Sequence, residues 1–525
     1  MAEETLPGAR RGWKSIEEET DYWIPEADVI GKIPKDLHGT LLRNGPGVNS
    51  VYGTQLKHPI DGDGMVCALS FVDGRVHFRS RFVSTQSRRD ESRAGALIYP
   101  GQMGTRRERG IVALACDAFL TFVRGPTSQM FEYRNPSNTS VFYWGGKILT
   151  TYETSLPHCL DPYTLTTLGP DDLGGKLRLG VMAAHFRFDT LQKPIKLCCF
   201  GIQPHLTRPA DIHFYEFDDK WNCVNVEHSV EGLNYAHDFL LLPHYYVVHM
   251  TPFVKVTMSQ AWKWKLGLSS PGEDMKYYPD LPSRFVFIPR PNHPDPRAAI
   301  ISVDADPFHI FHFGTGYQQG SDVFFTAVCL GRQFNMTFDE QIALSNISIA
   351  PGRVYKFHVN LSTRTCVGLQ ADSASVEFPT VNPYRHGQKS GQYSYLMAND
   401  RKNENLPYRD VVKFDFYGLQ RQVWSSHGVI GEPVFAPRNT FVRSSSSDDD
   451  DGYVLVQLYD PAVHRTEFVV LDARRVNDGP IARIRLKHHI PYGFHGSFTS
   501  ECFVRPLPRP GILDTAATLF LSAKL

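Results

Sequence analysis

Histidine is the residue type in this chain with the clearest capacity for metal chemistry. The chain has 21 histidines among 525 residues, and several of them lie in apolar or turn segments. Among these are His185 in MAAHFRF, His237 in LNYAHDF, His309 and His312 in FHIFHFG, and His495 in PYGFHGS. A neutral imidazole binds iron, zinc, copper or nickel through one ring nitrogen. The spacing alone selects no ligands, so a ring of inward-pointing histidines and ordinary buried histidines both stay open.

Other familiar catalytic and cofactor motifs are absent from the sequence. It contains no GxSxG elbow, no P-loop and no HExxH pair. The glycines of GTGYQQG (314–320) do not have the spacing of a dinucleotide fingerprint. DGDGM (61–65) begins like a calcium loop but lacks the later acidic ligands, so we expect a tight turn before a strand.

The charge balance argues against a polyanionic partner. Lys and Arg total 55, as do Asp and Glu, and the formal net charge is zero. Without a basic excess we expect no nucleic-acid binding, because neutralising phosphates needs clustered cations. A small apolar molecule fits this composition better, and the sequence leaves the oligomeric state open.

The cysteines and the apolar segments bear on compartment. The nine cysteines form no CxxC pair, so we expect reduced thiols rather than a disulfide framework or a zinc cluster. The first 23 residues lack the apolar core of a signal peptide, and no run of 20 apolar residues could span a membrane. We therefore expect a cytoplasmic protein. The apolar segment 111–123 is either buried core or a patch that makes peripheral membrane contact.

The elements that must position these residues are short strands. Segments rich in β-branched and aromatic residues, bounded by Gly, Pro, Asn or Asp, predict strands at 196–203, 211–218, 245–253, 284–290, 298–304, 322–330, 453–460 and 467–474. Few helical patterns intervene, which indicates an all-β barrel, sandwich or propeller, and the chain length favours a propeller. We expect an N-terminal arm at 1–20 and one domain over 21–525. The acidic stretch 444–452 would be a solvated loop, with calcium binding there as a minor alternative.

The order of ten sequence blocks gives a more specific indication. The blocks are GTLLRNGPG (39–47), HPIDGDGM (58–65), VFYWGGKIL (141–149), LDPYTLTTLG (160–169), MAAH (182–185), YAHDF (235–239), VEFPTVNP (376–383), GEPVFAPR (431–438), DDGY (450–453) and PYGFHGSF (491–498). In this order and over most of the chain they resemble the carotenoid cleavage oxygenases. Members of that family use non-haem iron to cleave conjugated C=C bonds.

The resemblance implies a fold and a metal site. It implies an all-β, seven-bladed propeller with a helical and loop dome over the face that holds one Fe(II). Its four histidine ligands carry over to His185, His237, His312 and His495. The family usually has two adjacent histidines where this chain has FHF, so His309 is the alternative to His312.

The resemblance also implies residues around the metal. Three glutamates that orient ligand histidines in the family correspond to Glu153, Glu377 and Glu432; the ligand matching His185 has no such partner there. Thr139 corresponds to a position that crowds one open metal site. The structural alternatives are surface charges for the glutamates and an ordinary strand residue for Thr139.

The implied reaction is cleavage of a carotenoid or apocarotenoid C=C bond to two carbonyls. This removes four electrons, which dioxygen accepts, so Fe(II) and O2 suffice and no nicotinamide or flavin is expected. The alternative is cleavage of a stilbenoid or phenylpropene such as resveratrol. Relatives of that branch carry a lysine where this chain has Tyr152, which disfavours the alternative, although a tyrosine hydroxyl can still bond a phenol.

A third hypothesis is a propeller that binds apolar ligands without catalysis. Four histidines and three glutamates at matching positions argue against it, because a binding protein has no need for seven metal-site residues. The sequence leaves the cleaved bond, the end groups of the substrate and membrane docking open.

Overall fold

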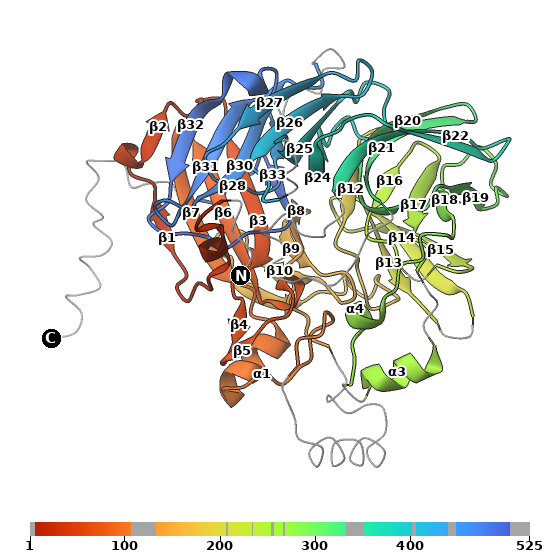
Figure 1. The fold of residues 1–525 in the computed structure, drawn as a ribbon, viewed down its shortest axis with the longest axis horizontal. Helices are drawn as coiled ribbons and strands as arrows, with labels where there is room; N and C mark the ends of the chain where they lie inside the picture. Colours follow the sequence, from red (N-terminus) through yellow and green to blue (C-terminus); the bar gives the residue numbers. More distant parts are fainter. Residues whose placement is uncertain are drawn as a thin grey trace.

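The computed structural model describes nine stretches of the chain: 6–106, 133–205, 208–233, 235–253, 257–265, 268–331, 351–401, 406–438 and 448–504. Within them the strands form seven sheets of four to six antiparallel strands and one separate two-stranded hairpin. The sheets are arranged around a common axis as the blades of a propeller (Figure 1). The expected all-β, seven-bladed propeller is confirmed.

Five blades consist of four consecutive strands each. The first two are β8 (Ser140–Trp144), β9 (Lys147–Thr151), β10 (His158–Leu160) and β11 (Thr167–Pro170), then β12 (Phe186–Asp189), β13 (Lys196–Gln203), β14 (Ala210–Phe217) and β15 (Cys223–Val230). The third is β16 (Phe239–Leu241), β17 (Tyr245–Met250), β18 (Ser283–Pro289) and β19 (Ile301–Ala305). The last two are β20 (His309–Gln319), β21 (Asp322–Leu330), β22 (Gly352–Asn360) and β23 (Thr365–Gln370), then β24 (Ser375–Val381), β25 (Tyr393–Asn399), β26 (Asp410–Asp415) and β27 (Arg421–Ser425).

The two remaining blades join the beginning and the end of the chain. One contains β1 (Asp21–Trp23), β3 (Gly39–Pro46), β6 (Gly64–Val72), β7 (Arg75–Phe82) and β33 (Gly496–Thr499). The other contains β2 (Val29–Gly31), β28 (Val429–Ile430), β29 (Val434–Pro437), β30 (Gly452–Asp460), β31 (Arg465–Asp472) and β32 (Pro480–Arg485). Thus β33 pairs with β3, and β2 pairs with β32. These two exchanges close the ring of blades.

The apolar core lies between neighbouring blades. Central strands such as β30 are buried on both faces, which explains their nearly continuous apolar sequence. One cluster packs Leu69 and Phe78, of the blade that contains β3, against Leu455, Phe468 and Ile484, of the blade that contains β30. Because apolar side chains fill the space between blades, the axis is left to the ends of the innermost strands, where polar side chains can meet.

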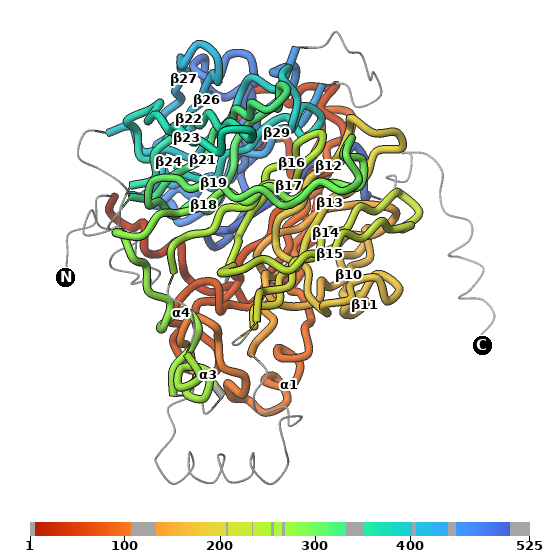
Figure 2. The backbone as a smooth tube through the Cα atoms, turned by 90° about the vertical axis from the view of Figure 1, so that its right-hand side faces the viewer, coloured from red at the N-terminus to blue at the C-terminus, as the bar shows by residue number. Residues whose placement is uncertain are grey.

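The helices lie together at one side of the propeller. They are α1 (Gln86–Ala94), α3 (Met258–Lys265) and α4 (Pro271–Asp274), beside the hairpin β4 (Ser50–Val51) and β5 (Thr54–Gln55) (Figures 1 and 2). Buried Asp61, in the segment predicted to be a tight turn, accepts hydrogen bonds from the main chain of Met103 (3.1 Å) and Thr105 (3.3 Å). This carboxylate therefore fixes a loop of the dome to the propeller. Short 3₁₀ turns are η1 (Ala9–Trp13), η2 (Glu26–Asp28), η3 (Pro59–Asp61) and η5 (Val476–Asp478).

Two outer segments are attached more firmly than the sequence indicates. In the N-terminal segment, Tyr492 donates a hydrogen bond to the Ala9 carbonyl at 2.7 Å. In the acidic segment, Asp449 and Asp450 are buried, and Asp450 pairs with Lys413 at 2.6 Å. The solvated-loop prediction was wrong for these two aspartates, because a buried lysine and main-chain amides hold their carboxylates. The other residues of that loop up to 447, and segment 111–123, lie outside the described residues.

No helix in the described stretches is long and apolar enough to cross a membrane.

Candidate metal centre

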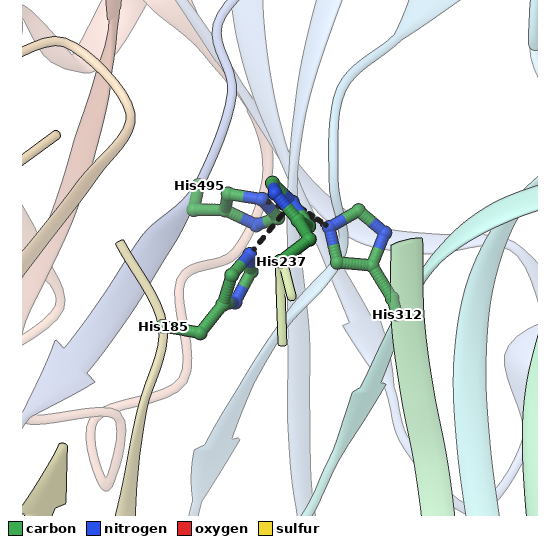
Figure 3. Close-up of side chains that lie close together, drawn as sticks. All are labelled: His185, His237, His312 and His495. Atoms are coloured by element: carbon green, nitrogen blue, oxygen red, sulfur yellow. Dashed lines mark hydrogen bonds between the residues drawn. The ribbon is translucent and has the colours of Figure 1, made fainter. Parts of the chain in front are cut away.

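Four histidines from four different blades meet at the propeller axis (Figure 3). His185 and His495 directly precede the innermost strands β12 and β33 of their blades, and His237 lies two residues before the innermost strand β16. His312 lies within β20, where the pairing with β21 shifts register between Ile310 and Phe313. Such a bulge re-aims a side chain relative to a regular strand. The side chains of residues up to 310 positions apart in the sequence (185 to 495) thus lie next to one another.

The ring nitrogens of these histidines face one another. The Nε2 atoms of His185 and His237 are 3.0 Å apart, as dashed in Figure 3. The Nε2 atom of His312 lies 3.2 Å from those of both His237 and His495. The other nitrogen of each ring, Nδ1, points away from this centre in the three histidines that have a glutamate partner.

The three predicted glutamates lie behind three of the histidines. His312 Nδ1 is 2.6 Å from Glu377 Oε2, and His495 Nδ1 is 2.7 Å from Glu432 Oε1. His237 Nδ1 contacts Glu153 Oε1. Each carboxylate accepts a hydrogen bond from Nδ1–H, so the unprotonated Nε2 of that histidine directs its lone pair at the centre. Glu377 and Glu432 are buried, so the surface-charge alternative fails for both.

The electrostatics of the site oppose extra protons on two rings. Burial and the neighbouring imidazoles lower the pKa of His185 well below its ordinary value. Burial also lowers the pKa of His495, against the raising effect of Glu432. At His312 burial has the same lowering effect, but the Glu377 carboxylate outweighs it and the pKa is raised.

This donor set fits a metal cation. With the Nδ1 protons donated to glutamates, the facing Nε2 atoms carry lone pairs and cannot hydrogen-bond to one another. Their close approach therefore needs a positive charge between them. Two nitrogens bound about 2.1 Å from one ion at a right angle are about 3.0 Å apart, which matches the separations of 3.0–3.2 Å here. Imidazole nitrogens suit iron, copper, nickel or zinc rather than magnesium or calcium.

His309 does not join the cluster. It is fully buried at the start of β20, and its Nδ1 lies 2.8 Å from Thr251 Oγ1. Of the two histidines in FHIFHF, the structure brings His312 to the axis.

Thr139 and Tyr152 are buried near the site. The Thr139 carbonyl accepts a hydrogen bond from the His495 amide at 3.0 Å, and its hydroxyl donates to Asn138 Oδ1 at 3.0 Å. Tyr152 follows β9 and precedes Glu153 in the chain, and burial raises its pKa well above the ordinary value. A neutral phenol is therefore expected at that position.

The sequence reasoning missed three side chains that support the site. Arg43 donates to Glu432 Oε2 at 2.7 Å, and Tyr235 donates to Glu153 Oε1 at 3.1 Å. The carboxylate of Asp238 lies 3.8 Å from His185 Nδ1. Arg43 lies in the block RNGPG, and the other two lie in YAHDF beside His237. Only the position of these charged or hydroxyl residues within recognised blocks could have drawn attention to them.

A cavity of about 140 Å³ adjoins the histidine cluster. His185, His312 and His495 reach it, and innermost strands supply most of its apolar wall, including Phe186, Phe378 and Phe435. The aromatic rings also pack directly on the ligands, since the centroid of Phe378 is 4.8 Å from that of His495. The cluster therefore adjoins a cavity whose wall contains several aromatic side chains.

Comparison with known proteins identifies the family. The model of the retinal pigment epithelial membrane protein family matches residues 13–500. The chain belongs to this family. It includes the carotenoid cleavage oxygenases, so the resemblance inferred from the ten blocks is confirmed.

Individual relatives cover nearly the whole chain. The apocarotenoid-15,15′-oxygenase of Synechocystis is 33% identical over 93% of this chain and 95% of its own length. The lignostilbene-α,β-dioxygenase isozyme III of Sphingomonas paucimobilis is 26% identical over 90% of this chain and 94% of its own. The cobalt-substituted Synechocystis enzyme, among solved structures, has a TM-score of 0.82 and 31% identity, covering 94% of this chain and 98% of that one.

Proposed function

We propose that this protein is an Fe(II)-dependent dioxygenase that cleaves a conjugated C=C bond of a carotenoid or apocarotenoid to two carbonyl products. The observation that carries the proposal is the convergence of four Nε2 atoms, with a glutamate behind three of the rings, in a chain of this family. The similarity to a named apocarotenoid oxygenase supports the substrate class.

In this proposal His185, His237, His312 and His495 hold the iron, and Glu153, Glu377 and Glu432 orient three of them. When bound, Fe(II) would supply the binding and activation of dioxygen. Four neutral imidazoles leave the ion its full charge and up to two open coordination positions. Thr139, whose main chain is tied to His495, would limit access to one of these positions.

Aromatic residues around the histidines would exclude water, bind the substrate and hold one glutamate in position. The side chains of Phe311 and Phe378 pack against His237 and His312, with ring centroids 5.1 Å and 5.0 Å apart respectively, so they exclude water and offer a surface for a polyene. Burial and the Glu153 carboxylate raise the pKa of Tyr235 well above its ordinary value, so its hydroxyl stays a donor that holds Glu153 against His237.

Metal and substrate are tested separately. Elemental analysis of protein purified under anaerobic conditions should give one iron per chain, and a chain without iron would favour the ligand-binding hypothesis. We then compare kcat/KM for an apocarotenal and for resveratrol. Neutral Tyr152 cannot compensate a phenolate, so the apocarotenal should be preferred. A clear preference for resveratrol would reject the carotenoid assignment in favour of stilbenoid cleavage.

We further propose that the dome side contacts a membrane surface, from which an apolar substrate would enter. On and beside α3 the side chains of Met258, Trp262 and Leu268 are 56%, 57% and 51% exposed, with Lys263 exposed among them. Exposed aromatic and aliphatic residues beside a lysine are typical of helices that bind at a lipid interface.

Co-sedimentation with vesicles containing anionic lipid tests this contact. The change Trp262→Ser should reduce binding several-fold. Leu369→Ser, at a position 60% exposed on strand β23 of a blade, is the matched control and should not. Equal binding of both variants and the unmodified protein would contradict the membrane contact.

A further inference from the structure

A buried carboxylate outside the three glutamates lies where three ligand-bearing segments meet. Asp238 directly follows His237, and its side chain is 1% exposed. Its Oδ1 atom accepts the Phe239 amide at 2.7 Å, and its Oδ2 atom accepts the Phe313 amide at 3.0 Å. Nη2 of Arg187 lies 2.7 Å from Oδ1 and 2.6 Å from Oδ2.

These contacts connect the innermost strands of three blades. Arg187 is in β12, two residues after His185; Asp238 is next to β16 and His237; Phe313 is in β20, next to His312. One carboxylate therefore fixes the relative positions of three candidate ligands. Because amide hydrogen bonds are directional, a displacement of any of these strands would break a bond to this buried charge.

Asp238 is also close to His185. That histidine has no glutamate behind it, whereas the other three each contact one. The nearest carboxylate oxygen to His185 Nδ1 that the described residues provide is Asp238 Oδ1, at 3.8 Å. This is too long for a hydrogen bond but close enough for electrostatic attraction to the N–H edge of the ring.

We propose that Asp238, held by Arg187, is a positioning residue for the metal site: it sets the register of β12, β16 and β20 at the axis and supports His185 in place of a fourth glutamate. This role rests on the proposed function, because it requires a metal held by the four histidines.

The test compares two buried aspartates of similar environment. Asp238→Asn removes the charge and one acceptor at the site. Asp410→Asn does the same at a buried carboxylate that is also paired with an arginine, Arg401, at 3.0 Å and also accepts a main-chain hydrogen bond, from the Asp400 amide at 2.9 Å. Asp410 lies in β26 and belongs to none of the possible metal-binding groups of the described residues. Both variants should lose apo-protein stability, so stability alone does not distinguish them.

The distinguishing measurements are the dissociation constant for Co(II), by competition with a chelator, and the d–d absorption of the cobalt-loaded protein. Supporting groups of metal ligands change affinity by about 10–100-fold, so Asp238→Asn should weaken cobalt binding about 10-fold and shift the spectrum. Asp410→Asn should change neither. If the two variants bind cobalt as tightly as the unmodified protein, or if both changes weaken cobalt binding equally, the positioning role is rejected.

A milder variant covers the case in which Asp238→Asn does not fold. Arg187→Lys retains the positive charge but loses Nη1, which donates to the Phe186 carbonyl at 2.9 Å and helps to hold the side chain in place. It should raise the cobalt dissociation rate several-fold with unchanged circular dichroism. An unchanged rate in the folded variant would overturn the proposal. If the unmodified protein itself binds neither iron nor cobalt, the proposed function fails, which is a different result from a failure confined to the variants.

Discussion

Glu432 and Glu377 each accept a hydrogen bond from a histidine Nδ1–H, but of the two only Glu432 also pairs with a buried arginine in the described part of the chain. Glu432 contacts His495 Nδ1, Arg43 Nη1 and the Gly496 amide, each at 2.7 Å. Glu377 accepts His312 Nδ1 at 2.6 Å and the Phe378 amide at 2.5 Å, and no ion pair with a Lys or Arg is recorded for it among the described residues. The same Glu→Gln change should therefore have different consequences at the two positions.

The magnitudes follow from burial. The side chains of Arg43 and Glu432 are 3% and 8% exposed, so removing the carboxylate leaves a buried guanidinium without its counter-charge. Breaking such a pair costs about 3–5 kcal/mol, whereas Glu377→Gln loses about one hydrogen bond, or about 1 kcal/mol. Both changes should weaken metal binding by about 10–100-fold, since each glutamate orients one ligand.

The assay separates the two effects. Urea denaturation of the metal-free variants gives the free energy of unfolding, and chelator competition gives the metal dissociation constant. Glu432→Gln should be impaired in both, and Glu377→Gln almost only in metal binding. Equal destabilisation of the two metal-free variants would refute the assignment of Arg43 to Glu432. Unchanged metal binding in Glu377→Gln would refute its role in orienting His312.

Three further predictions concern pH, ligand choice and oxygen. Burial lowers the pKa of His249 to about 3, so below pH 6.5 this histidine takes up a proton in the unfolded chain but not in the folded protein, and at pH 5 it lowers the free energy of unfolding by about 2 kcal/mol. The change His249→Asn should therefore reduce the difference in urea midpoint between pH 7.5 and pH 5, and an unchanged difference would contradict this prediction. His312→Ala should lose the metal while His309→Ala keeps it, as elemental analysis would show, and the reverse result would mean that the ligand register is wrong. Turnover in labelled dioxygen should place one labelled atom in each carbonyl product, because dioxygen accepts all four electrons; one atom consistently from water, with carbonyl exchange suppressed, would indicate a monooxygenase instead.

Strands of regular composition could be predicted closely. The segments 196–203 and 322–330 coincide with β13 and β21, because each is a mostly apolar run, rich in aromatic or β-branched residues, between turn residues. The strand predicted at 298–304 begins three residues before the observed strand β19, which starts at Ile301. Residues 298–300 follow a proline-rich turn and do not pair with a neighbouring strand. Local pattern thus places single strands well.

What the local pattern does not contain is which strands become neighbours. The pairing of β3 with β33 joins Arg43 to Gly496, and nothing in either segment specifies the other. The four histidines could be selected only by resemblance, because their common point depends on the geometry of four blades. Arg43, Tyr235 and Asp238 were missed for the same reason, because their partners lie in other blades. The burial of Asp450 depends likewise on Lys413, and that of Asp449 on the amides of Gln392 and Tyr393, all in a different blade.

The closure of the ring has a consequence for biosynthesis. β3 is translated early, but its edge partner β33 follows more than 400 residues later, together with His495, the last of the four histidines. A nascent chain therefore exposes an open strand edge and cannot assemble the complete metal centre until His495 has left the ribosome. In the proposed function, metal loading would therefore follow synthesis of the chain up to His495, and the bound ion would link the segment before β33 to the middle blades. Cells starved of iron should accordingly contain more chains whose final strand detaches and becomes accessible to proteases.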